Sequence, residues 1–227
     1  MPAWLVVRRG CCAPTGRRDH WRGSRVHTRT TTQLLEDLRE SGNADAWTRF
    51  DARYRPVLVG FARTLGFSPD DSAEVAQRTM VEFTRAYQSG RYERGQGRLS
   101  SWLIGIARNT AMSMRREGRR NRAVGGEAMQ DAAEAVIGDE AHLTRIWAKE
   151  RDSAVLAEAI RQLRGSPRME AHTMRAFELF ALRGVPAAEV AKECGIDVDS
   201  VYVIKNRLTK RLREIVRELT LAYEEGD

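Results

Sequence analysis

The chain has 227 residues, a formal net charge of +7 and 42% hydrophobic residues. That length suits one or two domains, and the hydrophobic content excludes a wholly disordered chain. No apolar run approaches the ~20 residues of a membrane-spanning helix. The basic balance makes nucleic acid the first partner to consider.

The cysteine and histidine patterns predict neither a metal site nor a disulfide framework. Cys11 and Cys12 are adjacent, Cys194 stands alone, and no C-x-x-C occurs. The four histidines are scattered without the spacing of metal ligands. The sequence also lacks a phosphate-cradling glycine loop and a nucleophile elbow. We therefore expect a cytoplasmic protein that is not an enzyme and that holds no metal or cofactor.

Much of the net charge belongs to an amino-terminal segment. Residues 1–29 hold seven arginines and one acid, whereas the other 198 residues carry 31 basic and 30 acidic groups. The segment has no helical period, so we expect a disordered basic extension. A mis-called translation start, with Val26 or a later residue as the true beginning, is the alternative. Charge arguments about the rest of the chain must therefore rest on local clusters.

Residues 30–122 predict a first helical domain. Ser68 suits a helix cap, and Pro69 suits the first turn of the helix that follows. Pro56 lies inside a helical pattern and should kink or break that helix. Apolar residues recur at helical spacing in four segments, of which the first three are followed by a glycine and the last ends on one: 30–41, 44–65, 69–89 and 100–118.

The second half of the chain begins with a change of composition. Residues 123–142 contain five acids and no lysine or arginine, which predicts a flexible acidic linker. Helical periodicity resumes near Leu143 and predicts a second domain over 143–227. We see no strand-like alternation. The predicted fold class is all-α, with two small helical domains joined by the acidic linker.

The strongest local pattern is a helix-turn-helix within the second domain. Two steeply crossing helices need a small residue at the crossing and a glycine in the turn, which Ala191 and Gly195 supply. Residues 205–217 then hold six basic side chains and one acid, a charge that suits a DNA major groove. A solvated basic hairpin is the alternative. The second helix would present these residues outward: Ser200, Tyr202, Val203, Lys205, Asn206, Arg207 and Lys210.

A second basic cluster lies in the first domain. Between residues 91 and 122 nine arginines stand against two glutamates, with Tyr92 and Trp102 among them. Arginine binds phosphates and aromatic rings stack on exposed bases, so the cluster favours nucleic acid. A purely structural role for Trp102 is the alternative. The preceding helix is acidic on its outer face, which indicates a protein partner there.

Taken in order, three stretches resemble a sigma factor of RNA polymerase, in the sigma-70 superfamily and of the compact extracytoplasmic-function (ECF) type. The stretch from Asp70 to Gln77 resembles the polymerase-binding segment of region 2. The stretch from Gly97 to Arg116 resembles the promoter-melting part of region 2, and the helix-turn-helix resembles region 4. The resemblance covers about residues 40 to 220.

The resemblance implies transcription initiation at specific promoters in complex with core RNA polymerase. Polymerase would bind Asp70, Asp71, Glu74 and Gln77, and the helix-turn-helix would read the −35 element. The acidic linker would thread the polymerase cleft, and an anti-sigma factor is a further partner that the resemblance allows. A free-standing helix-turn-helix transcriptional regulator is the alternative, although no dimerisation helix is evident. Recognition and melting of the −10 element would fall to Arg91, Tyr92, Arg98, Trp102, Arg108, Asn109, Arg115 and Arg116.

Overall fold

The computed structural model describes residues 31–39, 43–92, 97–121, 138–167 and 169–224, and all regular structure in these ranges is helical. This confirms the all-α prediction. The basic extension and most of the acidic linker lie outside the described residues. Among the described helices, none combines the length and the apolar character that a membrane crossing needs. The helices are α1 (Thr31–Arg39), α2 (Ala44–Thr64), α3 (Pro69–Gln88), α4 (Leu99–Asn121), α6 (Glu140–Arg164), α7 (Ala171–Phe177), η3 (Glu178–Leu182), α8 (Ala187–Cys194) and α9 (Val198–Glu224).

Side-chain caps fix the starts of α2, α3 and α6. The side chains of Asn43, Ser68 and Asp139 accept hydrogen bonds from backbone amides in the first turns of α2, α3 and α6. Each cap satisfies a donor that the helix itself leaves unpaired. The Ser68 cap and the first-turn position of Pro69 confirm the sequence prediction for α3.

The helix α2 runs through Pro56 without a break, so of the two predicted outcomes, a kink or a break, the break does not occur. Proline removes the hydrogen bond to the carbonyl four residues earlier, here that of Ala52. Both Pro56 and Ala52 lie on the exposed side of α2, where water can bond to the freed carbonyl. Tyr54 and Val57, on either side of the proline, are buried in one core and hold the helix together.

The first hydrophobic core lies among α1, α2, α3 and α4. At its centre the rings of Phe50 and Phe83 stack with centroids 4.4 Å apart, and both residues are fully buried. Trp47 and Tyr87 extend this aromatic cluster, and the Tyr87 hydroxyl donates to the Leu35 carbonyl of α1. The core therefore fixes α3 against α2 and places α4 beside α3.

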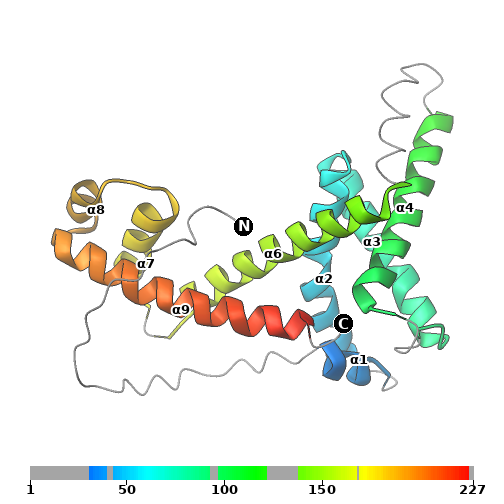
Figure 1. Ribbon diagram of the computed structural model, residues 1–227, viewed down its shortest axis with the longest axis horizontal. Coiled ribbons are helices and arrows are strands. Elements are labelled where there is room, and N and C mark those ends of the chain that lie inside the picture. The colour runs from blue at the N-terminus through cyan, green and yellow to red at the C-terminus, as the bar shows by residue number, and fades with distance from the viewer. Residues whose placement is uncertain (1–30, 40–42, 93–96, 122–137, 168, 225–227) are drawn as a thin grey trace.

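One helix, α6, contributes to both hydrophobic cores of the described chain. Leu143 and Trp147, near its start, pack in the first core, and the Trp147 ring lies 6.2 Å from that of Phe61. Val155 and Leu163 pack in the second core. Figure 1 shows α6 crossing from the group formed by α2, α3 and α4 to the group formed by α7 and α8. The division into two domains after residue 142 stays a prediction. The two hydrophobic cores share one helix, α6, which begins close to that predicted boundary.

The second core lies among α6, α7, α8 and α9. Val190 and Val201 are fully buried between α8 and α9, and Ala191 is buried beside them. Gly195, at the end of α8, has a φ of +66°, a left-handed conformation that glycine adopts without strain. Between α7 and α8 the chain makes a short π-helical segment, η3. The result is a helix, a tight turn and a longer second helix.

The far end of α9 returns to the first core. The Thr31 hydroxyl donates to the Ala222 carbonyl at 2.8 Å, and the Tyr223 hydroxyl donates to the Arg53 carbonyl at the same distance. The Tyr223 ring also meets Tyr54 edge-on at 5.6 Å. In Figure 1 the end of α9 accordingly lies beside α1 and α2. The two helical groups are thus joined twice, through α6 and through α9.

Candidate protein and nucleic-acid interfaces

A groove of about 740 Å³ runs between α3 and α4. Glu74 and Gln77, predicted to bind protein, line its α3 side. Arg91, Trp102 and Asn109, predicted to bind nucleic acid, line the same groove. The structure therefore brings parts of two predicted sites to the two walls of one groove.

The acidic residues at the start of α3 are exposed, and one of them also completes the helix cap. The Ser68 hydroxyl donates to Asp71 Oδ2 at 2.8 Å, while the Asp71 amide donates to Ser68 Oγ at 3.1 Å. Asp70 stands beside this pair on the surface. Carboxylates in the first turn are stabilised by the positive end of the helix dipole. Here they also form a negative surface that a protein can contact.

Glu74 takes part in an ion-pair network between α3 and α4. Arg78 Nε lies 2.7 Å from Glu74 and Arg78 Nη1 lies 2.9 Å from Glu117. Hydrogen bonds from Arg78 to these carboxylates, that to Glu117 first, raise the pKa of Arg78. The pairs are well exposed, so each adds little stability. Their effect is geometric, since Arg78 fixes the carboxylate of Glu74 at the groove edge.

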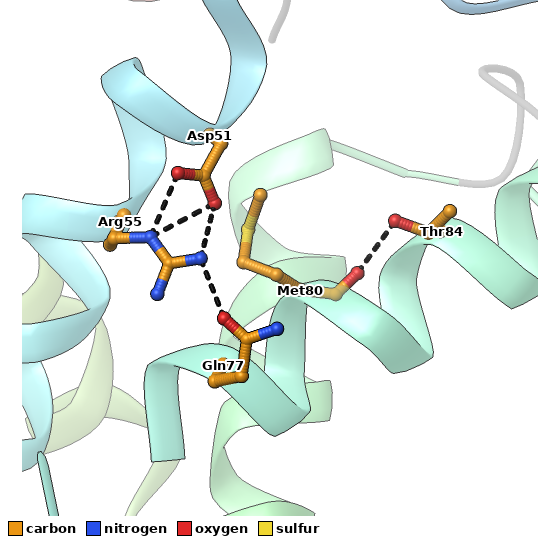
Figure 2. A network of polar contacts seen from close by, with 5 residues as sticks. All are labelled: Asp51, Arg55, Gln77, Met80 and Thr84. Atoms are coloured by element: carbon orange, nitrogen blue, oxygen red, sulfur yellow. Dashed lines mark hydrogen bonds and ion pairs between the residues drawn. The ribbon is translucent and has the colours of Figure 1, made fainter. Parts of the chain in front are cut away.

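Gln77 belongs to a second network, drawn in Figure 2, that sequence reasoning missed. Arg55 of α2 donates through Nε and Nη2 to the carboxylate of Asp51, at 2.7–3.0 Å. The hydrogen bond with Asp51 raises the pKa of Arg55. Arg55 Nη2 also donates to Gln77 Oε1 at 2.8 Å. The spacing of Asp51 and Arg55, four residues apart on a helix, is the signal that could have found the pair.

The Gln77 network borders a second groove of about 460 Å³ between α2 and α3. Trp47, Met80 and Val81 supply its apolar lining, and Gln88 lies at the end of α3. Figure 2 shows the Met80 side chain beside the Arg55–Gln77 contact. Gln77 lines both grooves, so it occupies the ridge of α3 that separates them.

Tyr92 and Trp102 form a stacked pair, with ring centroids 4.8 Å apart. Tyr92 is buried beneath the indole, at 8% exposure, and packs in the first core. Trp102 is half-buried, touches Phe83 edge-on at 5.3 Å and lines the α3–α4 groove. Trp102 therefore packs on the core and also reaches the groove, whereas the Tyr92 ring supports it from below.

The predicted basic residues of the first domain differ in exposure. Arg91, Arg98 and Arg116 are exposed, as is Asn109, whereas Arg108 is half-buried. Arg115 is also half-buried. It donates to the Leu65 carbonyl, and its guanidinium lies 5.2 Å from the Phe67 ring centroid. Arg115 thus binds the loop between α2 and α3, while the exposed arginines remain accessible to phosphates.

The outward face of α9 carries most of the other predicted site. Tyr202 and Val203 are 49% and 63% exposed, and Asn206, Arg207 and Lys210 are exposed beyond them. Lys205 is half-buried. Val201, Ile204, Leu208 and Leu212 face the core on the opposite side. One continuous surface of the helix therefore combines two apolar side chains with an amide and several cations.

Ser200 has a structural role at the start of α9. Its hydroxyl donates to Asp197 Oδ2 and its amide donates to Asp197 Oδ1, both at 2.7 Å. These bonds, that of the hydroxyl first, lower the pKa of Asp197. The Ser200 side chain therefore helps to cap the helix that presents the other residues.

Comparison with known proteins finds one family model that matches part of the chain. Residues 50–121, from within α2 to the end of α4, match the model of the family Sigma-70 region 2. No curated protein matches the chain. Among solved structures, CnrH in complex with the cytosolic domain of CnrY aligns over 82% of this chain and 96% of that chain. The identity is 19% and the TM-score is 0.31.

Proposed function

We propose that this chain is a member of the sigma-70 family and, within it, an ECF-type sigma factor. It directs core RNA polymerase to specific promoters and starts transcription there without catalysis of its own. The observation that carries the proposal is the family match over residues 50–121, which contain both walls of the α3–α4 groove. An anti-sigma factor is included as a partner only on the resemblance of the sequence.

Core polymerase binds the exposed ridge of α3 in this proposal. The ridge offers carboxylates at Asp70, Asp71 and Glu74, followed by the amide of Gln77. Arginine has only donors, so the amide oxygen of Gln77 must face Arg55. The amide nitrogen then points away from Arg55, as Figure 2 draws it. Polymerase thus meets a line of acceptors that ends in one oriented donor.

The unpaired −10 strand is held on the α4 side of the groove. Arg98 and Arg116 are exposed and can bind phosphates. Trp102 and Asn109 line the groove, where a base can stack on the indole and bond to the amide. The close approach of this surface to the α3 ridge supports the proposal, because promoter melting must take place on the polymerase.

The −35 element is read by α9. Its outward face carries Asn206, a side chain that can bond to a base edge, and Arg207 and Lys210, which can bond to flanking phosphates. The buried pair Val190 and Val201 fixes this helix against α8. A second helix held rigidly across a first is the geometry that docks in a major groove.

Reconstitution with core polymerase tests the proposal. The purified chain should co-elute with bacterial core polymerase and support transcription from specific sites in a library of fragments from its source genome. The double variant Asp71→Lys with Glu74→Lys should weaken co-elution while leaving DNA binding by α9 intact. The control is Asp152→Lys with Glu218→Lys, two exposed acids on α6 and α9. A chain that binds DNA but never polymerase would overturn the proposal in favour of a free-standing regulator.

A further inference from the structure

The most exposed large apolar side chain among the described residues is Val203, at 63%. It lies on the outward face of α9, because the fully buried Val201 and the buried Ile204 mark the side that faces the core. Removing the Val203 side chain from water would be favourable, yet no part of the described fold covers it. A binding partner that covered Val203 would gain this free energy.

The surroundings of Val203 are rigid and charged. Tyr202, beside it, meets the Phe180 ring edge-on at 5.3 Å, which fixes the start of the face. One turn further along the same face is Asn206, and Lys210 follows one turn after that. Six basic residues between 205 and 217 follow Val203 along α9, with one acid among them. An exposed acid, Asp199, lies one turn before it.

This combination points to DNA as the occupant. A protein helix that buried Val203 would also have to neutralise the cations around it, which phosphates on both sides of a groove do directly. In the major groove the one apolar group on a base edge is the C5 methyl of thymine. Asparagine, like glutamine, can pair with the N6 and N7 atoms of adenine. Val203 and Asn206 are one turn apart and would reach neighbouring base pairs.

We infer that Val203 contacts a thymine methyl in the element read by α9, so that this element contains an A·T pair at the Val203 position. The inference rests on the proposed function and adds a specificity-determining residue to it. Burial of one methyl group corresponds to about a fourfold gain in affinity. Uracil differs from thymine only by that methyl, so it is the matched probe.

The experiment uses the full chain bound to core polymerase. Duplexes are first selected from a randomised library, and the enriched sequence is then synthesised with uracil at each thymine in turn. Affinity is measured at one fixed salt concentration. One uracil position should weaken binding by about fourfold. The same position should have no effect on the Val203→Ser variant, because the variant has already lost the apolar contact.

The control variant is Leu221→Ser. Leu221 is 44% exposed and lies about five helical turns after Val203 on the same face of α9, away from the turn with α8. It should retain the full uracil effect. Equal affinity for thymine and uracil at every position would overturn the inference. A uracil effect that persists in Val203→Ser would overturn it as well, and a protein would then be the remaining candidate to cover Val203. If selection enriches no sequence, the proposed function fails and the inference fails with it.

Discussion

Arg55 orients the side chain of Gln77 by donating from Nη2 to Gln77 Oε1 at 2.8 Å. Three further hydrogen bonds join the same guanidinium to the carboxylate of Asp51, at 2.7–3.0 Å. A glutamine on an exposed helix usually rotates freely, but here the amide oxygen is occupied. The side chain therefore offers a partner only its donor end.

Replacing Gln77 by glutamate tests this orientation. The Gln77→Glu variant keeps the size of the side chain and the bond from Arg55 but removes the outward donor. Binding to core polymerase should weaken about tenfold, in line with the loss of a buried hydrogen bond. The measurement is the dissociation constant for core polymerase. Gln88→Glu, at the exposed end of the α2–α3 groove, makes the same chemical change and should bind as the unchanged chain does.

Two adjacent arginines on α4 should behave in opposite ways. Arg115→Ala removes the bond to the Leu65 carbonyl and the contact with Phe67, so it should lower the free energy of unfolding by about 1–3 kcal/mol. Arg116 is exposed, and Arg116→Ala should change that free energy by less than about 0.5 kcal/mol. Arg116→Ala should instead slow promoter opening. Denaturant titration and fluorescence of a labelled −10 strand separate the two effects, and equal stabilities would contradict the assignment.

The contact between α9 and α2 has its own test. Tyr223→Phe deletes only the hydroxyl that donates to the Arg53 carbonyl, and it should destabilise the fold by about 1 kcal/mol. Tyr202→Phe removes a hydroxyl from a ring that is half exposed and should leave stability unchanged. Thermal unfolding of both variants gives the comparison. A stable Tyr223→Phe protein would show that the end of α9 is held by its ring contacts instead.

The ionisation of Tyr223 should make the free energy of unfolding depend on pH in the alkaline range. Burial, followed by the nearby Tyr54, raises the pKa of Tyr223 well above its ordinary value of 10.0. Its contribution is therefore fully present below pH ~10, where the unfolded chain also keeps the proton. Above that pH the free energy of unfolding should fall by up to about 1.4 kcal/mol per pH unit. Denaturant titrations across this range should show a shallower fall for Tyr223→Phe.

Salt dependence tests the proposed phosphate contacts of α9. Arg207→Ala should reduce the slope of log affinity against log salt by about 1. Arg145→Ala, an exposed arginine on α6, should leave the slope unchanged. The holoenzyme and a selected promoter duplex supply the assay. An unaltered slope in Arg207→Ala would place that guanidinium away from the DNA backbone.

The sequence predicted the helices well because caps and apolar spacing depend only on residues close together in the chain. The Ser68 cap and the buried positions of α3 and α9 follow directly from spacing. The Asp51–Arg55–Gln77 network was missed because its last link joins two helices, and only packing decides which helices meet. The burial of Tyr92 was hidden for the same reason: an aromatic residue in a basic segment has the same sequence signature whether it faces the core or solvent.

The role of α6 was also hidden, although a signal existed. Leu143 and Trp147 lie on one side of the helix, and Val155 and Leu163 lie on nearly the opposite side. The apolar stripe therefore changes phase along the helix, which predicts two packing partners. Periodicity alone cannot say which partner takes which half.

Because α6 is continuous between the cores, the angle between them depends on the number of residues it contains. One residue inserted between Trp147 and Val155 would rotate the second core by about 100° about the helix axis, and the contacts of Ala222 and Tyr223 with the first core would have to break. The outward face of α9 would turn with it, away from the side on which α3 and α4 form their groove. Insertion of two whole turns would restore the orientation and change only the separation. The length of α6 thus sets the direction in which the outward face of α9 points relative to the groove between α3 and α4.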